Sequence, residues 1–171
     1  MEKIKGITIK KLTIKLEKMG DLLNYEGPIL SHFVSENNED FLFFWVESDE
    51  KYNRWLVYKT NHDFLIQFFK QQITHQDLIR ATVDGFVYLI DMDDDLDYKN
   101  IIITPIEELP TAYLPSIESY YDSENYEDYA AQLKIYLDLH LSRIIKFKAS
   151  DKLSTISLAM ESDSPIYKKP T

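Results

Sequence analysis

The chain has 171 residues, of which 44% are hydrophobic, and this content suits a packed domain rather than a disordered tail. It contains no cysteine, which excludes disulfides, thiol catalysis and thiolate metal sites. Its formal net charge of -10 at pH 7 disfavours nonspecific attraction to nucleic acid or to anionic lipid.

The first residues, MEKIKGITIKK, alternate lysine with isoleucine and lack the continuous apolar segment of a signal peptide. No stretch of the sequence approaches the roughly 20 apolar residues of a membrane span. We therefore expect a cytoplasmic protein. Residues 4–16 alternate apolar with polar side chains, and a change of phase at Lys10–Lys11 predicts a bulge or two short strands. Gly20 is expected to end this run.

Residues 24–58 carry both tryptophans and the clearest turn signals of the chain. Gly27 and Pro28 predict a tight turn, because glycine tolerates positive φ and proline fixes its own φ. Three strands are expected after it, over residues 29–34, 41–47 and 53–59, and short polar loops predict antiparallel pairing. Nearly every side chain from 41 to 46 is apolar, which predicts a strand covered on both faces.

Helix signals follow. Asn61 or Asp63 can cap one helix, and Thr74 with Asp77 has the spacing of a capping box at the start of a second. The Asp84–Gly85 turn then precedes strands over residues 86–90 and 101–103.

Three prolines interrupt residues 104–117 and predict an extended connector that Tyr113 and Leu114 anchor on the core. Residues 133–142 alternate apolar and polar side chains with a period of two, which favours a strand; a helix would place apolar groups all round. Ser150 can cap a last helix before a frayed tail.

These elements predict a single compact α+β domain with a mainly antiparallel, twisted sheet and a few short helices. We divide it into a sheet-rich core over 1–104, a connector rich in proline, tyrosine and acidic residues over 105–129, a C-terminal strand and helix over 130–161, and a tail over 162–171.

The motifs Tyr25-Glu26-Gly27-Pro28, Phe41-Leu42-x-x-Trp45-Val46, Arg54-Trp55-Leu56 and Asp84-Gly85-x-Val87 follow one another in order. In this, residues 11–91 resemble a group of uncharacterised bacterial proteins. Phe41 stands where that group usually has tyrosine, and Glu47 where it usually has aspartate. The resemblance implies a fold and an association with defence, toxin–antitoxin or phage-related systems, but no activity.

The densest carboxylate cluster follows the strand at 86–90, and it reads first as a solvated turn. Hard oxygen ligands at such spacing also suit Ca²⁺ or Mg²⁺, although the glycine and the closing glutamate of a calcium loop are missing. The metal-ligand candidates are Asp91, Asp93, Asp95 and Asp97. Asp97-Tyr98-Lys99 also has the acid-x-Lys spacing of many metal-dependent nucleases, with Asp84 or Asp91 as the preceding acid.

Other polar residues have mainly structural interpretations. The histidines, His32, His62, His75 and His140, lack the spacing of a helical zinc site. Glu47 and Arg54 are expected to form a surface pair across a hairpin, and the alternative is that Arg54 faces a ligand. With four glycines, the chain has no phosphate-cradling loop, and we predict no cofactor.

We expect a non-enzymatic module that binds or regulates another protein, one with a basic surface; self-association stays open. The candidate contact residues are Asp93, Asp94, Asp95, Tyr120, Tyr121, Tyr126 and Tyr129, because tyrosine is enriched at interfaces. One alternative is a metal-dependent hydrolase or nuclease that uses Asp84, Asp91 and the acids of 93–97. Another is an acidic decoy that blocks a DNA-binding enzyme.

Overall fold

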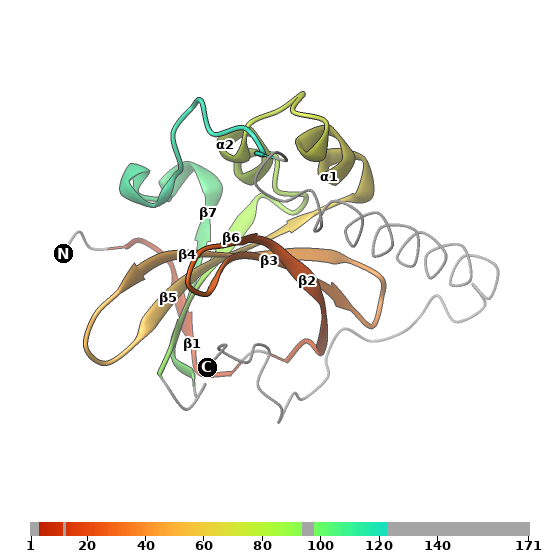
Figure 1. Ribbon diagram of the computed structural model, residues 1–171. Coiled ribbons are helices and arrows are strands. Elements are labelled where there is room, and N and C mark those ends of the chain that lie inside the picture. The colour runs from red at the N-terminus through yellow and green to blue at the C-terminus, as the bar shows by residue number, and fades with distance from the viewer. Residues whose placement is uncertain (1–3, 12, 94–97, 123–171) are drawn as a thin grey trace.

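A computed structural model describes residues 4–11, 13–93 and 98–122 of the chain. In these ranges, strands form one antiparallel sheet in the order β1-β7-β6-β5-β4-β3-β2 (Figure 1). The strands are β1 (Ile7–Ile9), β2 (Leu16–Asn24), β3 (Pro28–Ser35), β4 (Asp40–Ser48), β5 (Asn53–Thr60), β6 (Phe86–Met92) and β7 (Tyr98–Pro105).

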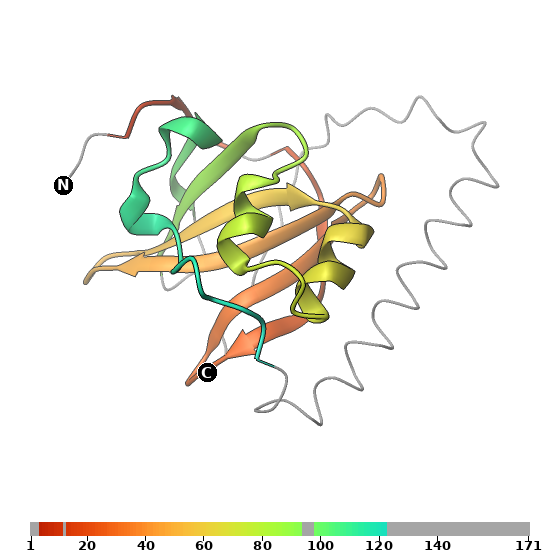
Figure 2. The same ribbon diagram turned by 90° about the horizontal axis from the view of Figure 1, so that it is seen from above.

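The helices and the 3-10 turns all lie over one face of this sheet (Figure 2). They are α1 (His62–Phe69), α2 (His75–Arg80), η1 (Ile106–Glu108) and η2 (Thr111–Tyr113). The chain is therefore α+β with a twisted antiparallel sheet, as predicted. Within the described residues, no helix is both long enough and apolar enough to cross a membrane.

The predicted hairpins and caps are confirmed. Glu26 and Gly27 have φ values of 53° and 146°, so the turn between β2 and β3 uses the positive φ that glycine tolerates. Asn61 accepts a hydrogen bond from the Phe64 amide and caps α1. Thr74 and Asp77 form the reciprocal capping box of α2.

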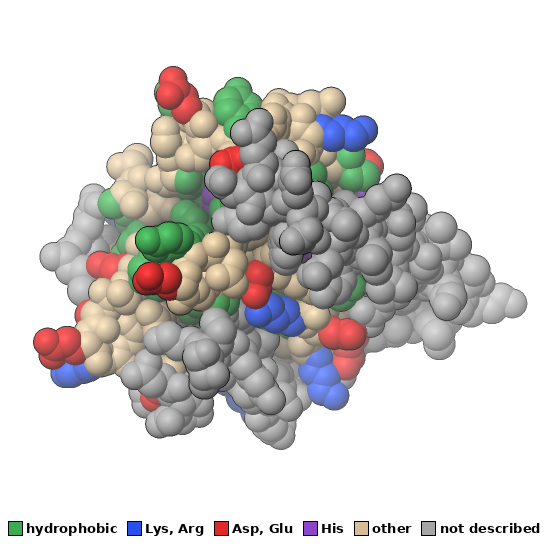
Figure 3. Space-filling model, in the orientation of Figure 1, with side chains coloured by type: hydrophobic (Ala, Val, Ile, Leu, Met, Phe, Trp, Pro, Cys, Tyr) green, Lys and Arg blue, Asp and Glu red, His purple; other side chains and the backbone are tan. Residues whose placement is uncertain are grey.

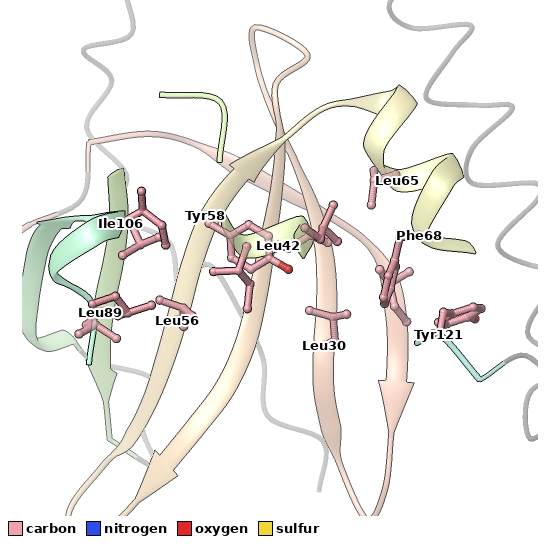
Figure 4. Close-up of a cluster of buried hydrophobic side chains, with 14 residues drawn as sticks. Leu30, Leu42, Leu56, Tyr58, Leu65, Phe68, Leu89, Ile106 and Tyr121 are labelled. Carbon is pink, nitrogen blue, oxygen red and sulfur yellow. The ribbon is translucent and has the colours of Figure 1, made fainter. Parts of the chain in front are cut away.

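The face under the helices carries the larger apolar cluster (Figure 4). Leu30 lies near Leu65 and Phe68 of α1, whereas Leu56 lies farther from that helix, with Leu42 between them. The other buried members are Leu22, Tyr58, Leu78, Ile79, Val87, Leu89, Ile106, Leu109 and Tyr121. Because successive strand residues alternate between faces, the strands also present a second apolar cluster on the opposite face. Its buried members are Phe33, Phe41, Phe43, Trp55, Val57, Ile90, Met92 and Ile101.

The sheet is strongly curled, as the chain between β1 and β2 requires. These two strands are the opposite edges of the sheet, and a flat sheet of this order would separate them by about 29 Å. Leu16 follows Ile9 by only seven residues, which reach at most about 25 Å even along the shortest path. The connection runs along the second apolar cluster, against which Ile14 packs.

The structure corrects two predictions for the N-terminal half. Gly20 does not end a strand but lies inside β2, where the pairing with β3 shifts register between Lys18 and Gly20. A ladder can resume after such a bulge, so the glycine marks an irregularity rather than an end. The run at 41–46 is covered on both faces only in its first half, because Trp45 is 40% exposed.

The predicted strand at 133–142, the last helix and the tail lie outside the described residues. The same holds for Asp94, Asp95, Asp97, Tyr126, Tyr129 and His140.

Candidate functional site

An irregularity in β4 sets the geometry of the main buried polar site. Trp45 pairs with Trp55, but the next pair along the hairpin joins Glu47 to Arg54, so β4 has one extra residue there. A bulge of this kind turns the following side chain onto the other face of the strand. It places Glu47 on the face of Arg54, beneath the η2 turn.

Arg54 lies opposite Asp91 of β6, and the two form a bidentate ion pair. Arg54 Nε donates to Asp91 Oδ1 over 2.7 Å, and Nη2 donates to Oδ2 over 2.8 Å. Each side chain is only 5% exposed. The hydrogen bonds with Asp91 raise the pKa of Arg54 and outweigh the opposing effect of desolvation, so the guanidinium stays charged.

Tyr113 of η2 completes the site. Its hydroxyl accepts a hydrogen bond from Arg54 Nη1 over 2.7 Å and donates one to Glu47 Oε2 over 2.9 Å. The guanidinium carbon lies 5.8 Å from the Tyr113 ring centre and 5.6 Å from that of Tyr52. Burial raises the pKa of Tyr113, which keeps its hydroxyl protonated. We call Glu47, Arg54, Asp91 and Tyr113 the arginine centre.

The arginine centre fixes one end of the segment that follows η2. Further along, Gln76 Nε2 donates to the Pro115 carbonyl over 2.9 Å, and the His75 amide donates to the Ser119 carbonyl over 2.7 Å. We call residues 113–121 the strap. It ends where the buried Tyr121 ring packs against Phe68 and Phe69, with ring centres 5.3 and 5.1 Å apart. The predicted anchoring of the connector at Tyr113 is therefore confirmed.

Two histidines are buried in the sheet core. His75 lies among aromatic rings, its Nε2 is 3.0 Å from the Tyr58 hydroxyl, and burial lowers its pKa to about 3. It is therefore neutral at physiological pH. His32 Nε2 lies 2.7 Å from Asp40 Oδ1, and His32 is level with Tyr58 in the sheet, because both pair with Leu42. Both histidines thus serve contacts within the core.

The prediction of a surface pair between Glu47 and Arg54 is correct for the pairing but wrong for its location. The two residues do pair across the hairpin, with Arg54 Nη1 3.6 Å from Glu47 Oε2. The pair is not a surface feature, however, because the strap and Asp91 enclose the guanidinium.

Of the predicted carboxylates, the structure describes Asp84, Asp91 and Asp93. Asp91 belongs to β6 rather than to a solvated turn, and both of its oxygens accept hydrogen bonds from Arg54. Asp84 precedes Phe86, the first residue of β6, so at least about 17 Å of extended strand separates it from Asp91. Among the residues that the structure describes, no three acidic or histidine side chains are placed to hold a metal ion.

The topology instead gathers acidic turns at one end of the sheet. Because successive connections of an antiparallel meander alternate between its ends, the β2–β3, β4–β5 and β6–β7 connections share one end. The described acidic residues of this end are Glu26, Glu47, Asp49, Glu50 and Asp93, and we call them the acidic end. Lys51 lies among them, and Lys10 follows β1 at the far edge.

Two exposed aromatic side chains belong to the same end. Tyr25 in the β2–β3 turn is 76% exposed, and Trp45 near the end of β4 is 40% exposed. Trp45 is held in place, because its Nε1 donates to Asn53 Oδ1 over 3.2 Å. Figure 3 shows hydrophobic and acidic side chains side by side over this part of the molecule.

Of the predicted tyrosine contacts in the described part, Tyr120 is 54% exposed whereas Tyr121 is 2% exposed. Sequence reasoning missed the arginine centre because its members are far apart in the chain. The available signal was Arg54 within an apolar strand and Asp91 at the end of another strand. The predicted strands do not by themselves show that these two residues lie opposite each other.

Comparison of the chain with protein-family models, curated proteins and solved structures gives no match.

Proposed function

We propose that the protein is a binding module that engages a protein partner with a basic surface through the acidic end of its sheet. The observation that carries this proposal is the convergence of acidic turns beside exposed aromatic side chains at one end of the sheet. Tyrosine and tryptophan supply large contact area with a polar tip, and they are enriched where proteins bind one another.

Charge distribution supports a basic partner. Glu26, Asp49 and Glu50 are exposed, and Lys51 is the basic residue among them. Asp49 also accepts hydrogen bonds from the Lys51 and Tyr52 amides, which fix the hairpin turn and lower the pKa of its carboxyl. The Asp49 carboxylate is therefore ionised and held in a defined position, and a fixed negative charge of this kind favours electrostatic steering of a cationic surface.

The arginine centre gives this end a rigid support. Arg54 and Asp91 neutralise one another, so the field at the surface comes from the exposed acids rather than from the buried pair. Tyr113 joins the β4–β5 hairpin to the strap, which holds Glu47 near the surface. A rigid surface loses little entropy when it binds. With this proposal we retain the expectations of a cytoplasmic location and a single domain.

The proposal is tested by affinity capture from the source cell with three versions of the full chain. The test variant is Glu26→Gln/Glu50→Gln, which removes two exposed carboxylates but leaves the turn-forming Asp49 intact. The matched control is Glu107→Gln/Glu108→Gln, which removes two exposed carboxylates from η1.

We expect at least one protein with a basic surface that wild type and the control retain and the test variant loses. Direct titration of that purified protein then verifies the contact. Equal retention of every captured protein by the test and control variants would refute the role of the acidic end.

A further inference from the structure

A second surface, of opposite charge, lies at the β1 edge of the sheet. Among the described residues, β1 pairs with β7 alone, so the outer side of this short strand meets no other strand. An edge strand of this kind presents backbone N–H and C=O groups that another chain can pair with. Ile7 and Thr8 are both exposed.

An apolar patch continues from this edge onto the sheet. Ile7 pairs with Ile103 and Ile103 pairs with Tyr88, so their side chains share one face, which Phe86 joins two residues before Tyr88. Ile7 is 69% exposed and Phe86 is 44% exposed. An incoming strand would therefore find both a backbone edge and an apolar surface beside it.

The flanking charges decide what this edge accepts. Lys5 and Lys10 lie at the two ends of β1, and both are exposed. Antiparallel pairing of two copies about Thr8 would set Lys5 of each copy against Lys11 of the other, and like charges directly opposite destabilise such a pair. An extended segment with carboxylates at both ends would meet opposite charges instead.

We propose that the β1 edge binds an extended, acidic-flanked segment of a partner protein as an additional strand. Backbone hydrogen bonds to β1 supply the pairing, an apolar side chain of the segment covers Ile7, and its flanking carboxylates pair with Lys5 and Lys10. Lys10 lies at the same end of the sheet as the acidic end but on its β1 edge, and the positive charge of this edge selects a partner of different chemistry. The inference goes beyond the proposed function and does not depend on it.

The test uses two blocked synthetic peptides with the same Val-Thr-Val core. One has two glutamates at each end, and the other has two lysines at each end. Each is titrated into the full chain while amide chemical shifts of β1 are followed by NMR. We expect shifts at Ile7–Ile9 with the glutamate peptide, and an affinity at least about fivefold above that of the lysine peptide, from several cross-strand charge pairs.

The Lys5→Glu/Lys10→Glu variant keeps the strand and reverses its flanking charges, so we expect the order of the two affinities to reverse. Unchanged β1 shifts with both peptides up to millimolar concentration would overturn the proposal. The same affinity order in the variant would also overturn it, as would a wild-type dimer whose interface is β1.

Discussion

Arg54 and Asp91 lie opposite each other on β5 and β6, and two parallel hydrogen bonds of 2.7 and 2.8 Å join their buried side chains. The pair is 37 residues apart in the chain, so it ties two strands whose connection contains both α-helices. Tyr113 extends the tie to the strap. The ion pair therefore links β5, β6 and the strap beside the acidic end.

Replacing Asp91 with alanine is expected to destabilise the fold by about 3–5 kcal/mol, because it leaves a buried guanidinium without its counter-charge. Urea unfolding measures the change. Glu50→Gln, at an exposed position of the same end, is the control and should stay within about 0.5 kcal/mol of wild type. Equal stability of the two variants would show that the ion pair is not a support of the fold.

Tyr113→Phe removes one hydroxyl that joins Arg54 to Glu47 and keeps the ring. We expect a loss of about 1–2 kcal/mol, because the buried Arg54 and the half-buried Glu47 each lose a hydrogen bond. Hydrogen exchange of the Leu114 amide, which donates to the Thr111 carbonyl, should accelerate more than that of strand amides in β3.

A double-mutant cycle that combines Tyr113→Phe with Glu47→Gln isolates the contribution of the hydrogen bond between these two side chains from a general destabilisation of the strap. Coupling of at least about 0.5 kcal/mol is expected for residues in contact. Additive effects of the two substitutions would mean that the strap is held by its apolar contacts alone.

Gly6→Ala should detach β1 from β7. A Cβ at Gly6 would lie 2.4 Å from the backbone oxygen of Ile103, so the two segments must move apart. We expect a loss of about 1–3 kcal/mol, the usual range for overpacking, and faster amide exchange in β7. Gly85→Ala is the informative control, since its Cβ meets no atom within 4 Å and only its φ of +77° opposes the change.

For Gly85→Ala we expect a cost of about 1–2 kcal/mol and no change of exchange at β7, because the cost comes from the left-handed backbone alone. Faster exchange at β7 in both variants would argue against a close approach specific to Gly6.

His75 makes stability depend on pH in a defined direction. Burial lowers its pKa in the folded state to about 3, below the ordinary value of 6.5 that it regains on unfolding. Between these values the unfolded chain binds the extra proton, so stability falls as pH drops from 6.5 toward 3, by about 1.4 kcal/mol per unit.

Glutamine does not titrate, so His75→Gln should reduce by one the number of protons taken up on unfolding between pH 6.5 and 3. The slope of stability against pH should fall accordingly. The comparison of urea unfolding for wild type and variant at several pH values cancels the shared contribution of the carboxylates. Parallel stability profiles over the window from pH 6.5 to 3 would contradict the assignment of a neutral buried imidazole.

The strands β3, β4 and β5 and both helix caps could be predicted from the sequence, because local signals determine them. Asn61 and Thr74 stand where helix starts need acceptors, and Gly27 supplies a positive φ. These features depend on neighbours within a few residues, so a pattern in the chain reports them directly.

The rest depends on contacts that no local pattern carries. Asp91 sits in an acidic run and looks solvated, yet its strand partner Arg54 buries it. The extra residue in β4 turns Glu47 toward Arg54. The sequence does not reveal it, because the preceding residues are all apolar and show no alternation in which a change of phase could be seen. The placement of β1 and β2 at opposite edges is likewise a property of the whole sheet.

The most direct test of the account is the affinity of the captured partner for the two charge variants, measured by calorimetry at low and physiological salt. We expect Glu26→Gln/Glu50→Gln to bind about three- to tenfold more weakly than wild type, with a smaller salt dependence, because two rim charges are lost. Glu107→Gln/Glu108→Gln should match wild type at both salt concentrations. Equal weakening by the two double variants would contradict the account, since it would assign the effect to net charge rather than to the acidic end.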